Sequence, residues 1–522
     1  MNQLTYLEGF RSTVRRYPDR EAIVTTDGRS FTYAELDERT DALAAALEER
    51  APGERVAVVA HNGVGVVESM LAAQKRGRAN VQLSTRGAAG ELASMMETAD
   101  AAGVMFSDGL ADAGAALTER MDLEVVVGIG EEAAAVDGAE SYEAMLAEAD
   151  PAAAPEEPAT DPAESAIFFT SGTTSKPKGV LHGHGKGINP CPAAYMEHNR
   201  DILGKAIFWS PSDWVWIAGF ANAIVPAFHY GRPLVAEPKS KFDPEHAFEL
   251  MAEFDVTDTL ITATALQKMR SVERPTERYD LSLDVIHSGG EEVTADLYEW
   301  VAETFDDVPL VQGYGLTEAQ PIVVNCPDWF EPLPGTIGKP VPGYDVAIID
   351  PETGERLPPG EEGMIAVKDD GEPGLFLEYI DDPEKTQEAY LDDWLLSGDL
   401  ATRDQDGYYW FDSRDDDVII TSGYRVGPAE VEAALAAHEA VRMAGVVGKP
   451  DQTRNEIIKA FVELEADVDP GSVTEADLQA FVRDRLAAYE YPREIEFADI
   501  PMRQSSKVDY EALRQRVREE VD

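Results

Sequence analysis

The chain has 522 residues, of which 44% are hydrophobic, and this is enough for several domain-sized units with buried cores. It carries 99 acidic against 44 basic residues, a formal net charge of −55, so its surface would repel nucleic acid and anionic membranes. No run approaches the ~20 apolar residues of a membrane span, and the first residues lack the apolar core of a signal peptide, which favours the cytoplasm.

The acidic residues are interspersed with apolar ones, as in residues 475–481. Such a uniformly acidic surface on an ordinary core predicts a protein adapted to molar intracellular salt, where the Debye length falls to ~3 Å. Cys191 and Cys326 are far apart in sequence and predict neither a disulfide framework nor a metal cluster. The sequence leaves homo-oligomerisation open.

The first ~150 residues, about one domain's worth, alternate strand-like and helix-like runs. Residues 55–60, 102–106 and 123–128 are short apolar runs typical of strands, and residues 66–74 have a helical pattern. This alternation predicts an α/β fold with layered parallel sheet. Residues 150–161 are rich in Pro, Ala and Glu and predict an exposed connector.

The next apolar run, residues 166–169, predicts a buried strand, and a loop dense in hydroxyls, glycines and lysines follows it over residues 170–179. Its backbone N–H groups, threonine hydroxyls and ammonium groups suit a polyanion such as a nucleotide triphosphate. The spacing is not that of a Walker loop, and the competing interpretation is a solvated linker.

From residue 344 onward the pattern changes to short strands separated by Gly, Pro and Asp turns, as in residues 344–350 and 363–367. This predicts a small β-rich subdomain. An acidic run over residues 412–417 is a candidate hinge, and a compact α+β pattern follows it. That part opens with a helix over residues 429–438, with Pro428 at its start.

Residues 170–179, followed by Val180, Leu181 and His182, resemble the phosphate loop of the adenylate-forming (AMP-binding) superfamily. That superfamily includes acyl-CoA synthetases, luciferases and peptide-synthetase adenylation domains. Further motifs extend the resemblance over nearly the whole chain. It implies an N-terminal AMP-binding domain over residues 1–415 and a small, mobile C-terminal domain over 416–522, with Asp416 as the hinge residue.

Three motifs are similar to the family's nucleotide-binding elements. Residues 314–318 (Tyr-Gly-Leu-Thr-Glu) imply that Glu318, with Thr170, binds Mg²⁺ against the triphosphate, and Mg²⁺ prefers oxygen ligands. Residues 288–292 resemble the segment that packs on adenine, and residues 394–399 imply that Asp399 accepts the ribose hydroxyls. The implied ATP-binding residues are Thr170, Ser171, Gly172, Thr173, Thr174, Lys178, Gly290, Glu291, Glu292, Gly313, Tyr314, Gly315, Leu316, Thr317, Asp399, Arg414 and Lys507.

Near the end, residues 501–508 resemble the segment that carries the family's catalytic lysine. Lys507 would bridge the carboxylate, α-phosphate and ribose oxygens while negative charge builds up. Ser506 and Ser175 stand where the family usually has glycine. With Lys507, the resemblance implies Glu318 and Thr170 as catalytic residues.

Residues 422–430 and 489–494 closely resemble medium-chain acyl-CoA synthetases, in which the first segment faces CoA. The implied CoA-binding residues are Ser422, Gly423, Tyr424, Arg425, Arg454 and Arg483. Cations retained in a chain so poor in basic residues favour a polyphosphate ligand.

The acyl pocket that the resemblance implies is apolar, and core packing is the competing interpretation of its aromatic residues. Its residues are Trp214, Trp216, Phe220, His287 and Gly315. Relatives restricted to acetate carry tryptophan at the position of Gly315, so glycine implies a longer acid. The pair His182 and His184 lacks a third metal ligand at suitable spacing.

The resemblance therefore implies an acyl-CoA synthetase that uses ATP, Mg²⁺ and CoA to activate a short- to medium-chain fatty acid through an acyl-adenylate. An aryl-acid CoA ligase and an adenylating enzyme that loads a carrier protein are the alternatives. A catalytically silent nucleotide-binding regulator is disfavoured because Glu318, Asp399, Arg414 and Lys507 are all present.

Overall fold

The computed structural model describes residues 5–155, 163–170, 177–187, 204–239, 241–290, 293–327, 329–371, 374–414, 419–465, 468, 471, 473–501, 508 and 510–521. The chain forms two compact units. The first comprises Met1–Thr85, Met96–Phe169 and Gly179–Ser413, and the second comprises Arg86–Met95, Thr170–Lys178 and Arg414–Asp522. Two short segments, Arg86–Met95 and Thr170–Lys178, are thus grouped with the C-terminal part of the chain. The domain boundary after residue 415 stays a prediction.

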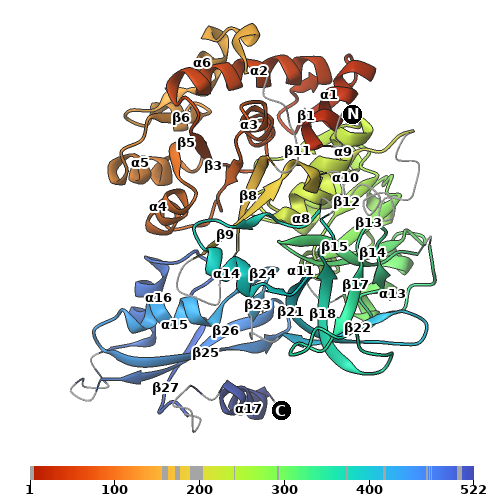
Figure 1. Ribbon diagram of the computed structural model, residues 1–522, viewed down its shortest axis with the longest axis vertical. Coiled ribbons are helices and arrows are strands. Elements are labelled where there is room, and N and C mark those ends of the chain that lie inside the picture. The colour runs from red at the N-terminus through yellow and green to blue at the C-terminus, as the bar shows by residue number, and fades with distance from the viewer. Residues whose placement is uncertain are drawn as a thin grey trace. The chain divides into compact units, whose positions relative to one another are not determined.

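The first sheet has eight strands, and its central strands β8, β4, β3, β5 and β6 run parallel (Figure 1). In sheet order the eight strands are β19 (Glu378–Tyr379), β9 (Lys178–Gly183), β8 (Glu164–Thr170), β4 (Asn80–Gln82), β3 (Arg55–Val59), β5 (Ala101–Ser107), β6 (Val125–Ile129) and β7 (Glu140–Ser141). The strands expected over residues 55–60, 102–106, 123–128 and 166–169 are therefore confirmed, as is the parallel α/β architecture.

Helices connect these strands, because parallel neighbours require crossover connections. The helices in this part of the chain are α2 (Tyr33–Arg50), which leads into β3, and α3 (Val64–Lys75), α4 (Ala89–Thr98), α5 (Ala111–Arg120) and α6 (Tyr142–Glu148). Short 3₁₀ turns lie at η1 (Ala133–Ala135), η2 (Pro151–Ala153) and, after β9, η3 (His184–Gly187). A capping box between Thr32 and Glu35 begins α2. Helix α3 includes the helix expected over residues 66–74, and every one of its residues is buried.

The second sheet has nine strands, and those from β14 to β1 run parallel. In sheet order they are β16 (Lys339–Pro340), β15 (Ala319–Asn325), β14 (Leu310–Leu316), β13 (Val285–Gly289), β12 (Asp258–Leu260), β10 (Phe208–Trp209), β11 (Leu234–Ala236), β1 (Glu21–Thr25) and β2 (Ser30–Thr32). Its helices are α1 (Tyr6–Arg16), α8 (Ile217–Gly219), the π-helix η4 (Phe220–Ile224), α9 (Val225–Tyr230), α10 (Pro244–Glu253), α11 (Ala263–Met269), α12 (Pro275–Arg278) and α13 (Ala295–Thr304).

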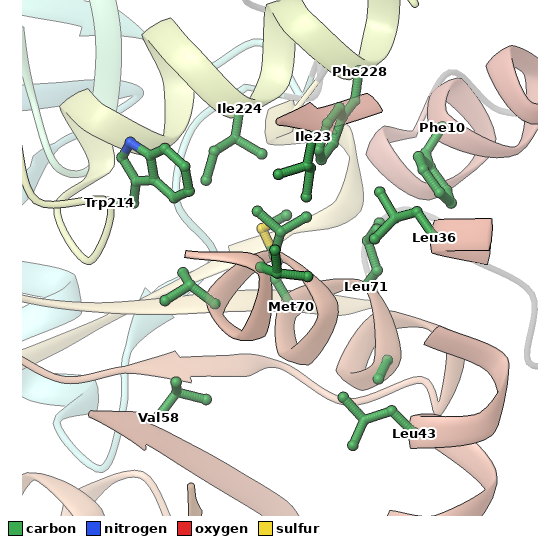
Figure 2. Close-up of a cluster of buried hydrophobic side chains, with 14 of the residues drawn as sticks. Phe10, Ile23, Leu36, Leu43, Val58, Met70, Leu71, Trp214, Ile224 and Phe228 are labelled. Carbon is green, nitrogen blue, oxygen red and sulfur yellow. The ribbon is translucent and has the colours of Figure 1, made fainter. Parts of the chain in front are cut away.

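The largest hydrophobic cluster joins the helices of both sheets. Figure 2 shows ten of its residues labelled, among them Phe10, Phe228 and Trp214. The rings of Phe10, Tyr33 and Phe228 lie 5.9 to 6.1 Å apart between centroids. The single proton of the buried Tyr33 hydroxyl is shared between the backbone carbonyl oxygens of Ala227 and Arg232, at 3.1 and 2.9 Å. The first ~30 residues, well under a domain's length, are therefore integral to this core.

A third, antiparallel sheet confirms the β-rich subdomain expected from residue 344 onward. Its strands are β17 (Val346–Ile349), β18 (Glu362–Lys368), β21 (Trp394–Arg403) and β20 (Tyr390–Leu391), with β22 (Tyr409–Arg414) also paired to β21 and the helix α14 (Pro383–Glu388) before β20.

The C-terminal part of the chain has one sheet and three helices in its described residues. The strands are β24 (Tyr424–Val426), β23 (Ile419–Thr421), β26 (Asn455–Leu464), β25 (Val441–Asp451) and β27 (Glu494–Phe497), and the helices are α15 (Pro428–Ala436), α16 (Glu475–Arg483) and α17 (Tyr510–Val521). Pro428 begins α15, as expected. Within the described ranges, no helix is long and apolar enough to cross a membrane.

Candidate nucleotide and acyl site

Two of the predicted nucleotide motifs lie at the same edge of the nine-stranded sheet. Strands β13 and β14 are parallel neighbours, and Gly289 pairs with Gly313. A Cβ on Gly289 would lie 2.6 Å from the carbonyl oxygen of Gly313, so only glycine permits this approach. Gly290 follows with φ +77°, a conformation that also favours glycine. Ligands of open α/β sheets bind at this carboxyl edge.

Thr317 and Glu318 form the two-residue turn between β14 and β15, because Leu316 pairs with Ala319. The Tyr-Gly-Leu-Thr-Glu motif therefore ends one strand, crosses the turn and presents Glu318 at its tip. Glu318 is only partly buried. Its carboxylate suits Mg²⁺, which is usually held by one or two protein carboxylates together with substrate phosphates.

Tyr379, which the sequence did not single out, holds this carboxylate. Its hydroxyl donates a 2.5 Å hydrogen bond to Glu318 Oε1, and the Phe376 N–H donates one of 2.8 Å to the Glu318 carbonyl oxygen. Burial, followed by the charge of Glu318, raises the pKa of Tyr379 well above its usual range, so the phenol remains protonated. No local sequence signal connects residues 61 positions apart.

The third motif joins the same site through Tyr314. The Tyr314 hydroxyl donates a 2.6 Å hydrogen bond to Asp399 Oδ2, so β21 of the antiparallel sheet contributes its carboxylate beside β14. The Tyr314 ring also lies 6.5 Å from that of Phe411 on β22, which is 43% exposed. An exposed phenylalanine beside two predicted nucleotide residues is a further candidate that sequence reasoning missed.

The predicted acyl-pocket residues fall into two groups. Trp214 is 1% exposed and belongs to the large core cluster of Figure 2. Phe220 also belongs to this cluster and packs against Tyr6 and Phe168, with ring centroids 5.6 and 5.5 Å away. It begins the π-helix η4, a type of helix frequently found at functional sites.

The other three predicted acyl-pocket residues lie outside the large core cluster. Trp216 and Gly315 are partly exposed, whereas His287 on β13 is 1% exposed. His182 and His184 are both buried. Over the ranges given above, the structure has no group of three or more His, Cys, Asp or Glu side chains able to hold a metal ion.

In the C-terminal part, the predicted CoA segment forms a tight hairpin. Ser422 and Gly423, with φ of +53° and +82°, form the two-residue turn between β23 and β24, and positive φ at both positions is typical of a type I′ turn. The Arg454 guanidinium donates a 3.4 Å hydrogen bond to Ser422 Oγ. Tyr424 stacks on Tyr489 with ring centroids 4.2 Å apart.

Three arginines lie in the same part of the chain: Arg454, Arg483 and Arg493. We call them the arginine cluster. The guanidinium carbons of Arg483 and Arg493 lie 3.9 and 4.3 Å from the ring centroid of Tyr491. Desolvation lowers the pKa of Arg493; Tyr491 opposes this shift, and the charges of Arg454 and Arg483 add to it. Arg493 and Tyr491 were not predicted as site residues.

The remaining predicted residues are placed as follows. Thr170 ends β8 and Lys178 begins β9, and both are partly buried. Arg414 ends β22 and Arg425 lies within β24. Ser171, Gly172, Thr173, Thr174, Glu291, Glu292, Asp416 and Lys507 lie outside the described residues, as does Cys191.

Comparison with known proteins agrees with this architecture. The AMP-binding enzyme family matches residues 10–380, and the AMP-binding enzyme C-terminal domain matches residues 430–507. The chain therefore belongs to the AMP-binding enzyme family.

Curated relatives include the mitochondrial acyl-coenzyme A synthetase ACSM4 of Mus musculus, 37% identical over 360 residues, and the acetyl-coenzyme A synthetase of Bacillus subtilis, 35% identical over 347 residues. These matches cover 67% and 66% of this chain, but only 60% and 59% of the relatives' own lengths.

Solved structures match over nearly the full chain. The amide bond synthetase McbA from Marinactinospora thermotolerans has a TM-score of 0.85 and 29% identity, covering 98% of this chain and 99% of its own. A benzoate CoA ligase from Burkholderia xenovorans has a TM-score of 0.71 and 25% identity, covering 98% of this chain and 100% of its own.

Proposed function

We propose that this protein is an AMP-forming acyl-CoA synthetase that activates a short- to medium-chain fatty acid. The observation that carries the proposal is the contact between Tyr314 and Asp399 beside the Glu318 turn. It gathers a ribose-binding carboxylate, an aromatic face and a metal-binding carboxylate at the carboxyl edge of a parallel sheet. The curated relatives named acyl-coenzyme A synthetases support this assignment.

In the first half-reaction, the acid's carboxylate oxygen attacks the α-phosphorus of ATP, forming the acyl-adenylate and releasing pyrophosphate. Asp399 accepts hydrogen bonds from the ribose hydroxyls, and the exposed ring of Phe411 offers the adenine an apolar face. Glu318, with Thr170, would hold the Mg²⁺ of Mg·ATP, and the ion would supply neutralisation of phosphate charge. Lys507 stabilises the charge that develops on the α-phosphate.

In the second half-reaction, the CoA sulfur attacks the acyl carbonyl carbon, loses its proton and releases AMP. The arginine cluster supports CoA as the acceptor, because it concentrates three cations in a chain of net charge −55. Guanidinium groups bind phosphate oxygens in bidentate geometry, and the nucleotide end of CoA is rich in phosphates. In this proposal, rotation of residues 416–522 about Asp416 replaces Lys507 with the CoA-facing hairpin.

The proposed substrate class is a fatty acid longer than acetate. Gly315 adds no side chain at the tip of β14, which favours an acid longer than acetate. An aromatic acid is the alternative, and the structural relative that is a benzoate CoA ligase favours testing it. An amide-forming reaction is a second candidate, since the structural relative McbA is an amide bond synthetase.

The decisive experiment measures pyrophosphate release with acetate, butyrate, hexanoate, octanoate and benzoate, and then product formation with CoA, a carrier protein or a simple amine. We expect CoA-thioester formation with hexanoate or octanoate as the fastest reaction. The proposal would be contradicted if none of these acids supported pyrophosphate release, or if product formed only with an amine or a carrier protein.

A further inference from the structure

We propose that Tyr379 is a positioning residue for the metal-binding carboxylate of Glu318, an inference that rests on the proposed function. The Tyr379 hydroxyl donates to Glu318 Oε1 across 2.5 Å, and the Phe376 N–H donates to the Glu318 carbonyl oxygen across 2.8 Å. One short segment, residues 376–380, therefore holds both the side chain and the backbone of Glu318. We call this segment the strap.

The strap is itself fixed to the strand that leaves the predicted phosphate loop. The Leu377 N–H donates to the Leu181 carbonyl oxygen across 2.7 Å, and the Ile380 N–H donates to that of Gly179 across 2.8 Å. Strand β9, which contains both acceptors, begins directly after residues 170–177. The strap thereby links the exit of the phosphate loop to the carboxylate at the tip of the β14–β15 turn.

The backbone N–H of Tyr379 is also held by a hydrogen bond. Its N–H donates to Thr386 Oγ1 across 2.9 Å, and Thr386 lies in α14. The Tyr379 ring is 8% exposed and lies 4.9 Å from the Phe376 ring between centroids. The phenol oxygen is therefore held in place before any ligand arrives.

This arrangement matters because Glu318 sits on a two-residue turn, where a long side chain has several accessible rotamers. A metal ion that had to order the carboxylate would bind more weakly, because part of the binding free energy would be spent on ordering it. Outer partners of ligating carboxylates orient them, and losing one typically costs 10-fold to 100-fold in metal affinity. Tyr379 is placed to act in this way.

The competing explanation is that Tyr379 only fills the core beneath the antiparallel sheet. Tyr379→Phe separates the two, since it keeps the ring and removes the hydroxyl. A matched control is Tyr344→Phe: the Tyr344 hydroxyl also donates to an oxygen, the Gly374 carbonyl at 3.0 Å, and its ring packs against the same hydrophobic cluster.

The experiment is calorimetric titration of the full-length protein with ATP, once with saturating MgCl₂ and once with EDTA. We expect Tyr379→Phe to weaken binding of Mg·ATP about tenfold and to leave binding of metal-free ATP within about twofold. Tyr344→Phe should leave both affinities unchanged. Because Tyr379 acts through Glu318, the double variant E318Q/Y379F should bind Mg·ATP no more weakly than E318Q.

Three results would overturn the role of Tyr379 and leave the proposed function standing. They are an unchanged affinity of Tyr379→Phe for Mg·ATP, an equal loss of ATP affinity with and without the metal, and additive losses of affinity in the double variant. Absence of Mg²⁺-dependent ATP binding by the unaltered protein would overturn both. If Tyr379→Phe fails to fold, Thr386→Val takes its place. It removes the acceptor of the Tyr379 N–H, and the same metal-specific loss is expected, with an unchanged affinity counting against the inference.

Discussion

The hydroxyl of Tyr314 and the carboxylate of Asp399 are joined by a 2.6 Å hydrogen bond although they lie 85 residues apart. The bond connects β14 of the nine-stranded sheet with β21 of the antiparallel sheet. Asp399 is 3% exposed, so the surrounding fold sets the orientation of its side chain. Two motifs that lie far apart in the sequence are thus joined by a direct hydrogen bond.

Tyr314→Phe should weaken ATP binding about tenfold, because hydrogen bonds to charged groups contribute about 1.5–3 kcal/mol. Calorimetric titration with Mg·ATP measures the effect. The control is Tyr409→Phe, which removes the hydroxyl of a buried tyrosine that donates to the Val346 carbonyl oxygen across 2.9 Å. An unchanged affinity in Tyr314→Phe would show that Asp399 does not need this partner.

Arg483→Ala should raise the KM for CoA about tenfold, because it removes a cation of the arginine cluster worth about 1.5–3 kcal/mol to a bound phosphate. Acid-dependent pyrophosphate release in single-turnover measurements without CoA should stay unchanged. Arg485→Ala is the matched control, since Arg485 is also exposed and its guanidinium carbon lies 3.4 Å from the ring centroid of Phe481. Equal effects of both variants would point to general surface charge.

Gly315→Trp should reverse acid preference toward acetate, because an indole at the tip of β14 would fill space needed by a long acyl tail. Each lost methylene contact is worth about 1–3 kcal/mol, so the ratio of kcat/KM for hexanoate to that for acetate should fall at least about tenfold. Gly315→Ala is the control and should still accept hexanoate. A constant ratio in Gly315→Trp would place residue 315 outside the acyl pocket.

His184 should make stability depend on pH. It is fully buried, and burial, with a smaller contribution from Arg11, lowers its pKa from 6.5 to about 4. Because the unfolded state then binds more protons between these values, the free energy of unfolding falls as pH drops through this window. The loss should be about 2 kcal/mol between about pH 7 and about pH 5.

Urea unfolding of the unaltered protein and of His184→Gln at both pH values isolates this effect. The variant should lack this part of the pH dependence, while all other titrating groups are shared. Parallel pH dependence in the two proteins would contradict a depressed pKa for His184.

Salt should stabilise the fold. With a net charge of −55, self-repulsion opposes compaction, and raising salt from about 0.1 M to about 2 M shortens the Debye length from ~10 Å to below ~3 Å. Circular-dichroism melts in KCl should therefore show a melting temperature that rises with concentration. Sorbitol at matched osmolality is the control. A salt-independent melting temperature would require another explanation for the acidic surface.

The local pattern of the sequence was enough to predict several elements and the family. Strands such as residues 55–60 and 363–367 and the helix begun by Pro428 follow from hydrophobic periodicity and turn residues, which act over a few positions. The motif at residues 314–318 is likewise contiguous, so the sequence was enough to recognise it, whereas its place at the end of β14 came from the structure.

The contacts between distant segments were decided only by the tertiary structure. Tyr379 reaches Glu318 because β19 pairs with β9, and the stacking of Arg483 and Arg493 on Tyr491 arises where the end of α16 lies beside the segment leading into β27. The burial of Trp214 in the core also depends on which helices cover which sheet. Sheet order and helix packing set these contacts, and neither has a periodic signature in the amino-acid sequence.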